Sequence, residues 1–210
     1  MENDIEIKKR ILTTARDEFI SFGFTKVSID GIASKMGMSK KTIYKYFPSK
    51  DDLVHAVTDT TLKEMETRCK NIIENNDIDS VEKLRQMMTT AAIHTSKMGK
   101  PLIEDLEKNA PHVWKEISEF RNKRIYEDFG KLLQEGVEQG IFRNDVDVQL
   151  VLMIYANVIR NIISPEILMR LPFTATQVYE TIVKVIFEGI LTETGREHCL
   201  TPIKDKIKNN

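Results

Sequence analysis

Residues 28–50 restrict the fold of this 210-residue chain more than any other stretch. They contain two short apolar patterns that are joined through a glycine. The first pattern has the i, i+3, i+4, i+7 spacing of one helix face and ends at Gly37. Ser39 then precedes a second pattern, which Pro48 prevents from continuing. Serine is a favoured N-cap and glycine a favoured C-cap, so the stretch predicts two short helices and a tight turn. The apolar members are Ile29, Ile32, Ala33 and Met36, followed by Ile43 and Phe47.

The outer face of the second predicted helix combines cations with hydroxyl groups and aromatic rings. Residues 35–50 contain five lysines and no Asp or Glu. Ile43 and Phe47 are expected to face inward, which leaves lysine, threonine and tyrosine outside. Ammonium groups suit phosphates, whereas hydroxyls, methyl groups and flat rings suit base edges in the major groove. The stretch is therefore predicted to be a helix-turn-helix that reads DNA. We call residues 28–50 the helix-turn-helix segment.

This segment and its surroundings resemble the DNA-binding domain of TetR/AcrR-family transcriptional regulators, over about the first quarter of the chain. The matching positions are Phe19, Gly23-Phe24, Val27-Ser28-Ile29, Ile32-Ala33, Gly37-Met38-Ser39, Thr42-Ile43-Tyr44, Tyr46-Phe47, Ser49-Lys50-Asp51 and Leu53.

The resemblance implies a set of residues that contact phosphates or bases. Two positions depart from the family pattern: Lys41 stands where a small residue or proline is frequent, and Met36 where alanine or leucine is frequent. An extra cation at position 41 would change which DNA sequence is read. An alternative for the two tyrosines of the set is packing, and lysines on a helix are often simply solvated. The implied DNA-binding residues are Ser28, Ser39, Lys40, Lys41, Thr42, Tyr44, Lys45, Tyr46 and Lys50.

The rest of the chain is predicted to be helical throughout. The whole chain has only six prolines, and its apolar residues recur with helical spacing. The expected fold class is all-α, with a three-helix DNA-binding domain at residues 1–49. A larger helical domain for ligand binding and dimerisation is expected at residues 50–195. Residues 196–210 lack clear apolar periodicity and are predicted to fray.

Two helices near the C-terminus, at about residues 146–163 and 176–191, carry apolar side chains on nearly every face. A helix of this kind is buried on more than one side. We interpret the two as a homodimer interface in which both copies form a four-helix bundle. The alternative is that both helices belong to one large monomer core.

Large and polarizable side chains are scattered over several helices of the second domain. They predict a pocket for a small, largely apolar effector, in which a few polar groups orient the ligand. The alternative is that they form ordinary core. The tentative ligand-binding residues are Met88, His94, Trp114, Phe120, Tyr126, Phe129 and Tyr155.

No pattern in the chain indicates an enzyme. The four histidines show no metal-ligand spacing, and no phosphate-binding glycine loop or nucleophile elbow is present, so no metal or cofactor is expected. The first ten residues are charged, and the longest apolar run is about half of the ~20 residues that a membrane span needs. With only two cysteines, a reduced compartment is expected, so we predict a cytoplasmic protein.

Two functional hypotheses follow. The first is a ligand-responsive transcriptional regulator, more often a repressor in the family that the chain resembles. It would bind a palindromic operator as a homodimer and be released by the effector. The second is a helical small-molecule binder or protein-interaction module without specific DNA binding. Sequence-specific, salt-dependent DNA binding distinguishes the first from the second.

Overall fold

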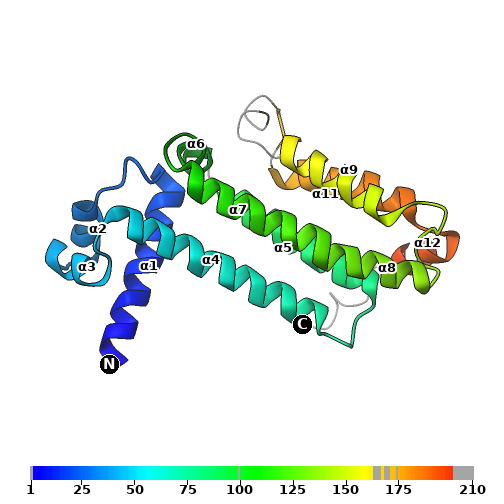
Figure 1. Ribbon diagram of the computed structural model, residues 1–210, viewed down its shortest axis with the longest axis horizontal. Coiled ribbons are helices and arrows are strands. Elements are labelled where there is room, and N and C mark those ends of the chain that lie inside the picture. The colour runs from blue at the N-terminus through cyan, green and yellow to red at the C-terminus, as the bar shows by residue number, and fades with distance from the viewer. Residues whose placement is uncertain (1, 99, 163–166, 168–170, 174, 201–210) are drawn as a thin grey trace. The chain divides into compact units, whose positions relative to one another are not determined.

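The structure is a computed structural model, and it describes residues 2–98, 100–162, 167, 171–173 and 175–200. All named elements of these residues are helices, and their only β-structure is an isolated antiparallel bridge between Phe142 and Leu191. The all-α prediction is confirmed. In chain order the helices are α1 (Glu2–Phe22), α2 (Ile29–Met36), α3 (Lys40–Tyr46), α4 (Lys50–Ile73), α5 (Ser80–Lys97), α6 (Lys100–Asn109), α7 (Pro111–Arg124), the π-helical turn η1 (Ile125–Phe129), α8 (Gly130–Glu138), α9 (Val148–Ile162), α11 (Ala175–Ile190) and α12 (Glu193–Leu200) (Figure 1).

The contacts divide the chain into two compact units. The first unit comprises residues 1–69 and 96–120, and the second comprises residues 70–95 and 121–210. The first unit therefore extends beyond residue 49, where the sequence places the end of the DNA-binding domain. It takes in most of α4, together with α6 and most of α7. The assignment of DNA binding and regulation to separate domains stays a prediction.

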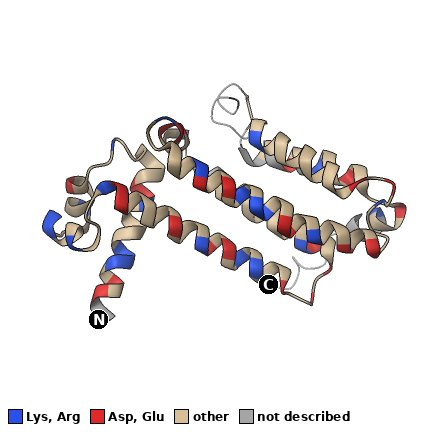
Figure 2. Cartoon of the chain, in the orientation of Figure 1, with Lys and Arg blue, Asp and Glu red and all other residues tan. Residues whose placement is uncertain are grey.

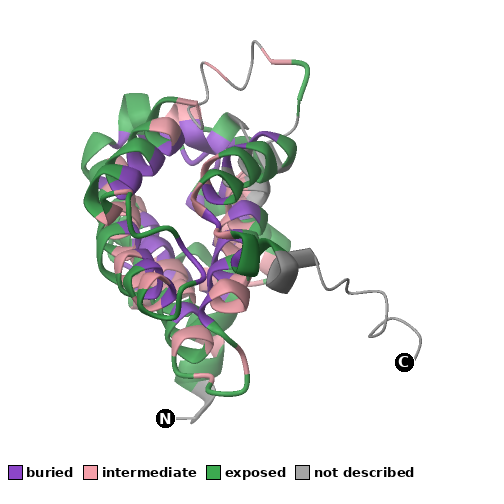
Figure 3. Cartoon of the chain, turned by 90° about the vertical axis from the view of Figure 1, so that its right-hand side faces the viewer, coloured by how far each residue is buried: buried purple, intermediate pink, exposed green. Residues whose placement is uncertain are grey.

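The first unit is built on one apolar core beneath the helix-turn-helix segment. Helix α1 contributes an apolar stripe, in which Ile11 and Ala15 are completely buried. Val113 of α7 joins the same core although it lies some hundred positions later in the chain. Figure 3 marks the buried, intermediate and exposed residues along each helix. Other members of this core are Phe19, Ile32, Ile43, Phe47, Leu53 and Leu106.

The second unit contains the two apolar C-terminal helices, and they pack against each other (Figure 1). The predicted helix at 146–163 is α9, which begins at Val148 because Asp147 caps it by accepting from the Leu150 amide at 3.0 Å. The predicted helix at 176–191 is α11, and Ile163 lies outside the described residues.

Residues 196–200 of the predicted tail belong to α12, and the fraying of the tail stays a prediction. Thr192 starts this helix by accepting the Gly195 amide on its hydroxyl oxygen at 2.9 Å. A Cβ on Gly195 would lie 2.3 Å from the carbonyl oxygen of Ile141, so only glycine permits this close approach. Residues 201–210 lie outside the described part of the chain.

Candidate nucleic-acid interface

Local caps set the bounds of the helices in the helix-turn-helix segment. The Ser28 hydroxyl accepts the Gly31 amide at 3.0 Å and starts α2. Gly37 ends α2 in the left-handed conformation, with φ of 63°. The Ser39 hydroxyl accepts the Thr42 amide at 3.1 Å and starts α3. Each cap was predicted from the sequence, and each satisfies a backbone group that the helix itself leaves unpaired.

Helix α3 places its apolar and polar residues on different faces. Ile43 is fully buried, and Phe47, which caps the C-terminus, is 3% exposed. Lys41 and Tyr44 lie on the exposed side, with 39% of Tyr44 accessible. Among the described residues, no carboxylate lies within ion-pair distance of the Lys41 ammonium group. Lys41 and Tyr44 are therefore free to reach a base or a phosphate.

Three other predicted contact residues are held by carboxylates of neighbouring helices. Lys40 pairs with Asp30 of α2 at 3.1 Å, and Lys45 pairs with Asp4 of α1 at 3.2 Å. The Tyr46 hydroxyl also donates to Asp4. These hydrogen bonds lower the pKa of Asp4, with Tyr46 contributing most, and raise the pKa of Lys45.

Sequence reasoning missed these carboxylates. Asp30 lies ten residues before its lysine, and Asp4 lies more than forty residues before its partners. No periodic spacing signals pairs of this kind, because they depend on how α1 and α2 pack against α3. Figure 2 shows both signs of charge on α1, beside α2 and α3.

Lys50 has a structural role in addition to its predicted contact with DNA. Its ammonium group donates to the Thr25 carbonyl at 3.1 Å and lies 5.5 Å from the centre of the Phe24 ring. Partial burial lowers the pKa of Lys50, against the opposing effect of the Asp105 and Asp51 charges. Replacement of Lys50 would therefore disturb the loop before α2 as well as any phosphate contact.

Asp105 of α6 also contacts the loop between α1 and α2. Its carboxylate accepts both the backbone amide and the hydroxyl of Thr25, and the Asn109 side-chain amide at 2.7 Å. Gly23, which ends α1 with φ of 79°, lies so close that a Cβ there would be 2.8 Å from the carboxylate. Burial by itself would raise the pKa of Asp105, but the hydrogen bonds from Thr25 and Asn109 outweigh it and lower the pKa. The sequence offered no signal for this contact between α6 and the α1–α2 loop.

Asp105→Asn is expected to lower the free energy of unfolding by about 1 kcal/mol at pH 7, after allowance for solvent screening. The variant turns one acceptor oxygen into a donor that faces the donors of Thr25. Because the folded-state pKa of Asp105 lies below its unfolded value, its stabilisation is present above about pH 4. That stabilisation is lost as pH falls through the folded-state pKa. Urea unfolding at pH 7 and pH 3 should show a difference between wild type and variant that shrinks in acid.

The matched control is Glu107→Gln, which neutralises an exposed carboxylate on the same helix. It should leave the free energy of unfolding nearly unchanged at pH 7. Equal losses for Asp105→Asn at both pH values would contradict an electrostatic role for the contact.

The seven predicted ligand-binding residues are divided between the two compact units, and the site that they were predicted to form stays a prediction. Trp114 and Phe120 belong to the first unit, where Trp114 packs against the core. The other five lie in the second unit. Met88, Phe129 and Tyr155 are buried there, His94 is half-buried, and Tyr126 is 44% exposed.

Tyr155 is the centre of an aromatic cluster in the second unit. Its ring stacks on Phe129 at 5.5 Å between centroids and meets the edge of Phe187 at 5.7 Å. Phe129 lies in η1, the π turn that follows α7 directly. Helix α9 passes close to the following residue, Gly130, where a Cβ would lie 3.2 Å from Leu152.

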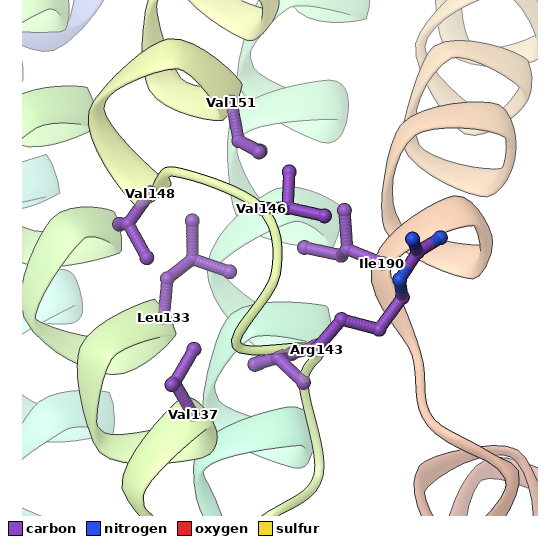
Figure 4. A pocket seen from close by; sticks show the side chains of 8 residues that line it. Leu133, Val137, Arg143, Val146, Val148, Val151 and Ile190 are labelled. Carbon is purple, nitrogen blue, oxygen red and sulfur yellow. The ribbon is translucent and has the colours of Figure 1, made fainter.

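An apolar pocket lies elsewhere in the second unit. Figure 4 shows the side chains of Leu133, Val146 and Ile190 converging from α8, the loop after it and α11. The enclosed space is only about 10 Å³, roughly what one water requires. None of the seven predicted ligand-binding residues lines it. The full lining comprises Leu133, Val137, Phe142, Arg143, Val146, Val148, Val151 and Ile190.

In the part of the chain that the structure describes, no group of three His, Cys, Asp or Glu side chains is placed to hold a metal ion. Within the same residues, no helix has both the length and the apolar character that crossing a membrane requires.

Residues 11–57 match the family model described as bacterial regulatory proteins, tetR family. The chain is 30% identical over 188 residues to the uncharacterised HTH-type transcriptional regulator YvaF of Bacillus subtilis. The matched region covers 88% of this chain and 96% of YvaF. It is 26% identical over 147 residues to the HTH-type transcriptional repressor KstR2 of Rhodococcus jostii, covering 68% of this chain and 71% of KstR2. The fold is similar to that of a putative transcriptional regulator from Saccharomonospora viridis in complex with choline. That similarity has a TM-score of 0.69 and 23% identity, and covers 90% of this chain and 99% of the other.

The match to YvaF spans nearly the full length of both proteins, and the family model covers α2, α3 and most of α1. The relatives are named as transcriptional regulators and not as enzymes. The chain therefore belongs to the tetR family of bacterial regulatory proteins and is a ligand-responsive, DNA-binding transcriptional regulator.

Proposed function

We propose that the protein is a repressor that binds a palindromic operator as a homodimer and reads it with α3. The observation that carries this proposal is that α3 has one buried face and one exposed face. Ile43 is buried in the core, while Lys41 and Tyr44 are exposed. A helix held in this way can enter a major groove without disturbing the core beneath it. The proposed contacts with DNA are those predicted from the sequence, with Lys41 and Tyr44 as the residues that read bases.

The proposed dimer interface is the exposed apolar face of α9, together with α11. Leu150, Met153 and Ile154 lie on α9 at helical spacing and are 49–57% exposed. Val185 of α11 is 69% exposed. Such side chains lose contact with water when a second copy covers them, and a two-fold interface places the same face of each copy opposite itself. Two copies would present their α3 helices to two half-sites of one palindrome.

We further propose that the effector is a small, largely apolar molecule bound in the second unit. Buried Met88, Phe129 and Tyr155, with half-buried His94, support this proposal by their chemistry. The 10 Å³ pocket beside Arg143 is far too small for such a molecule. Release of the protein from DNA requires only that the effector bind more tightly to the form that does not bind DNA. The coupling free energy between effector binding and DNA binding would be about 1–3 kcal/mol.

Selection of bound duplexes from random DNA tests this function and yields the operator. Lys41→Ala and Tyr44→Ala are each expected to weaken operator binding roughly tenfold at fixed salt, because each removes a contact in the groove. Fluorescence anisotropy with the selected duplex measures the effect. Lys63→Ala is the matched control, since Lys63 is an exposed lysine of α4 that pairs with Asp59 outside the helix-turn-helix segment.

Recovery of no preferred sequence would reject specific DNA binding and support the alternative of a helical binding module. A selected site without two-fold symmetry would contradict the homodimer. Unchanged affinity for both the Lys41 and Tyr44 variants would contradict α3 as the helix that reads the operator.

A further inference from the structure

The lysines of the helix-turn-helix segment are largely neutralised by carboxylates from outside residues 35–50. Lys35 pairs with Glu18 of α1, Lys40 with Asp30, and Lys45 with Asp4. Residues 35–50 contain no acidic residue, yet these ion pairs leave little uncompensated positive charge at their surface.

The contacts of Asp4 resemble those of a DNA phosphate. A tyrosine hydroxyl and an ammonium group, from neighbouring residues of α3, both donate to one carboxylate oxygen. Hydroxyl and ammonium donors are what proteins use to hold phosphate oxygens of the DNA backbone. The Asp4 carboxylate thus occupies the place that a phosphate oxygen would take between Tyr46 and Lys45.

Asp30 acts on the other half of α3. Its carboxylate lies 3.1 Å from the ammonium group of Lys40, which also lies 5.8 Å from the centre of the Tyr44 ring. The side chains of Asp4, Asp30 and both lysines are at least half exposed. Exposed ion pairs are weak, so a phosphate can displace either carboxylate. The displaced carboxylate remains near the phosphate and repels it.

Lys41 differs from these lysines, because no carboxylate among the described residues pairs with it. Its charge is available to any DNA without displacement of an internal partner.

We propose that Asp4 and Asp30 determine specificity by competing with DNA phosphates for Lys45, Tyr46 and Lys40. Their carboxylates weaken binding to DNA of any sequence, since that binding depends almost entirely on phosphate contacts. Discrimination between sequences then falls to Lys41 and Tyr44. The proposal rests on the proposed function, because it requires that α3 face DNA.

Asp4→Asn and Asp30→Asn, singly and together, test the proposal in the full-length protein. Each variant is expected to bind a short duplex of scrambled sequence roughly threefold to tenfold more tightly at low salt. Each should also steepen the plot of log affinity against log salt concentration by about one unit, as one more lysine becomes available to phosphate. Affinity for the selected operator should rise less, so the ratio of specific to non-specific affinity should fall. Anisotropy titrations over a series of KCl concentrations measure all three quantities.

Asp59→Asn is the matched control, because it removes the same charge from an exposed carboxylate whose partner is Lys63. Equal salt slopes for Asp59→Asn, Asp4→Asn and Asp30→Asn would overturn the proposal, since net charge alone would then explain the effect. Weaker binding by Asp4→Asn would also overturn it, because the carboxylate would then be orienting Tyr46 and Lys45 for DNA.

Failure of this proposal can be distinguished from failure of the proposed function. If the wild-type protein binds its operator and the Lys41 variant binds it more weakly, the function stands whatever the aspartate variants do. If the wild-type protein binds no duplex, both proposals fail together.

Discussion

Ile154→Asp is expected to convert the proposed homodimer into monomers and to lower operator affinity by at least about 100-fold. Ile154 is 56% exposed on α9, beside Leu150 and Met153 on the same helix face. In a two-fold interface the new carboxylate of one protomer would lie in a dry apolar layer, near the same carboxylate of the second protomer. Burial of unpaired like charges costs several kcal/mol. A monomer contacts one half-site only and loses the second set of contacts. Analytical ultracentrifugation and anisotropy with the operator measure both effects.

The control for this variant is Gln134→Asp, which adds the same charge at an exposed position of α8. It should remain dimeric and bind the operator normally. The circular dichroism spectrum of Ile154→Asp should stay helical, because the native side chain is mostly outside the core of its own copy. A dimeric Ile154 variant with unchanged affinity would show that the interface lies on another face.

Tyr155→Ala is expected to lower the free energy of unfolding by about 3–5 kcal/mol, the usual cost of removing a buried aromatic side chain. Tyr155 is completely inaccessible to solvent, and its ring contacts those of Phe129 and Phe187. The truncation leaves a cavity at the centre of the second unit, which close-packed neighbours fill only in part. Urea unfolding at fixed protein concentration measures the change, since the stability of a dimer depends on concentration.

Two further variants separate packing at position 155 from a role in effector binding. Tyr155→Phe keeps the ring and should cost much less than the alanine variant. Tyr126→Ala removes a ring that is 44% exposed and should change stability little. A loss below about 1 kcal/mol for Tyr155→Ala would indicate a ring that lines open space, as the ligand-binding prediction requires.

The helix-turn-helix was predictable because its determinants are local. The apolar spacing that buries Ile32 and Ile43, the serine caps and the glycine at position 37 each act within one helical turn. The exposed position of Tyr44 also follows from that spacing. Such features depend on covalent geometry and nearest neighbours, so they can be inferred without knowledge of the tertiary fold.

The electrostatics of the same segment were not predictable. The absence of acidic residues from 35–50 suggested a strongly basic surface, but Asp4 and Asp30 compensate two of its lysines. Similarly, the contact between Asp105 and Thr25 joins residues eighty positions apart. The close approach of Gly195 in α12 to the carbonyl oxygen of Ile141 is likewise a contact that sequence periodicity does not report.

The sequence by itself thus determined the helical fold, the helix-turn-helix and the residues of α3 that face outward, because apolar periodicity and capping are short-range properties. Tertiary structure alone decided which of those residues have a carboxylate partner within the protein. Among the described residues, it supplied such partners to Lys40 and Lys45 but not to Lys41. The physical reason is that ion pairs require proximity in space, which the packing of α1 and α2 against α3 creates between residues far apart in the chain.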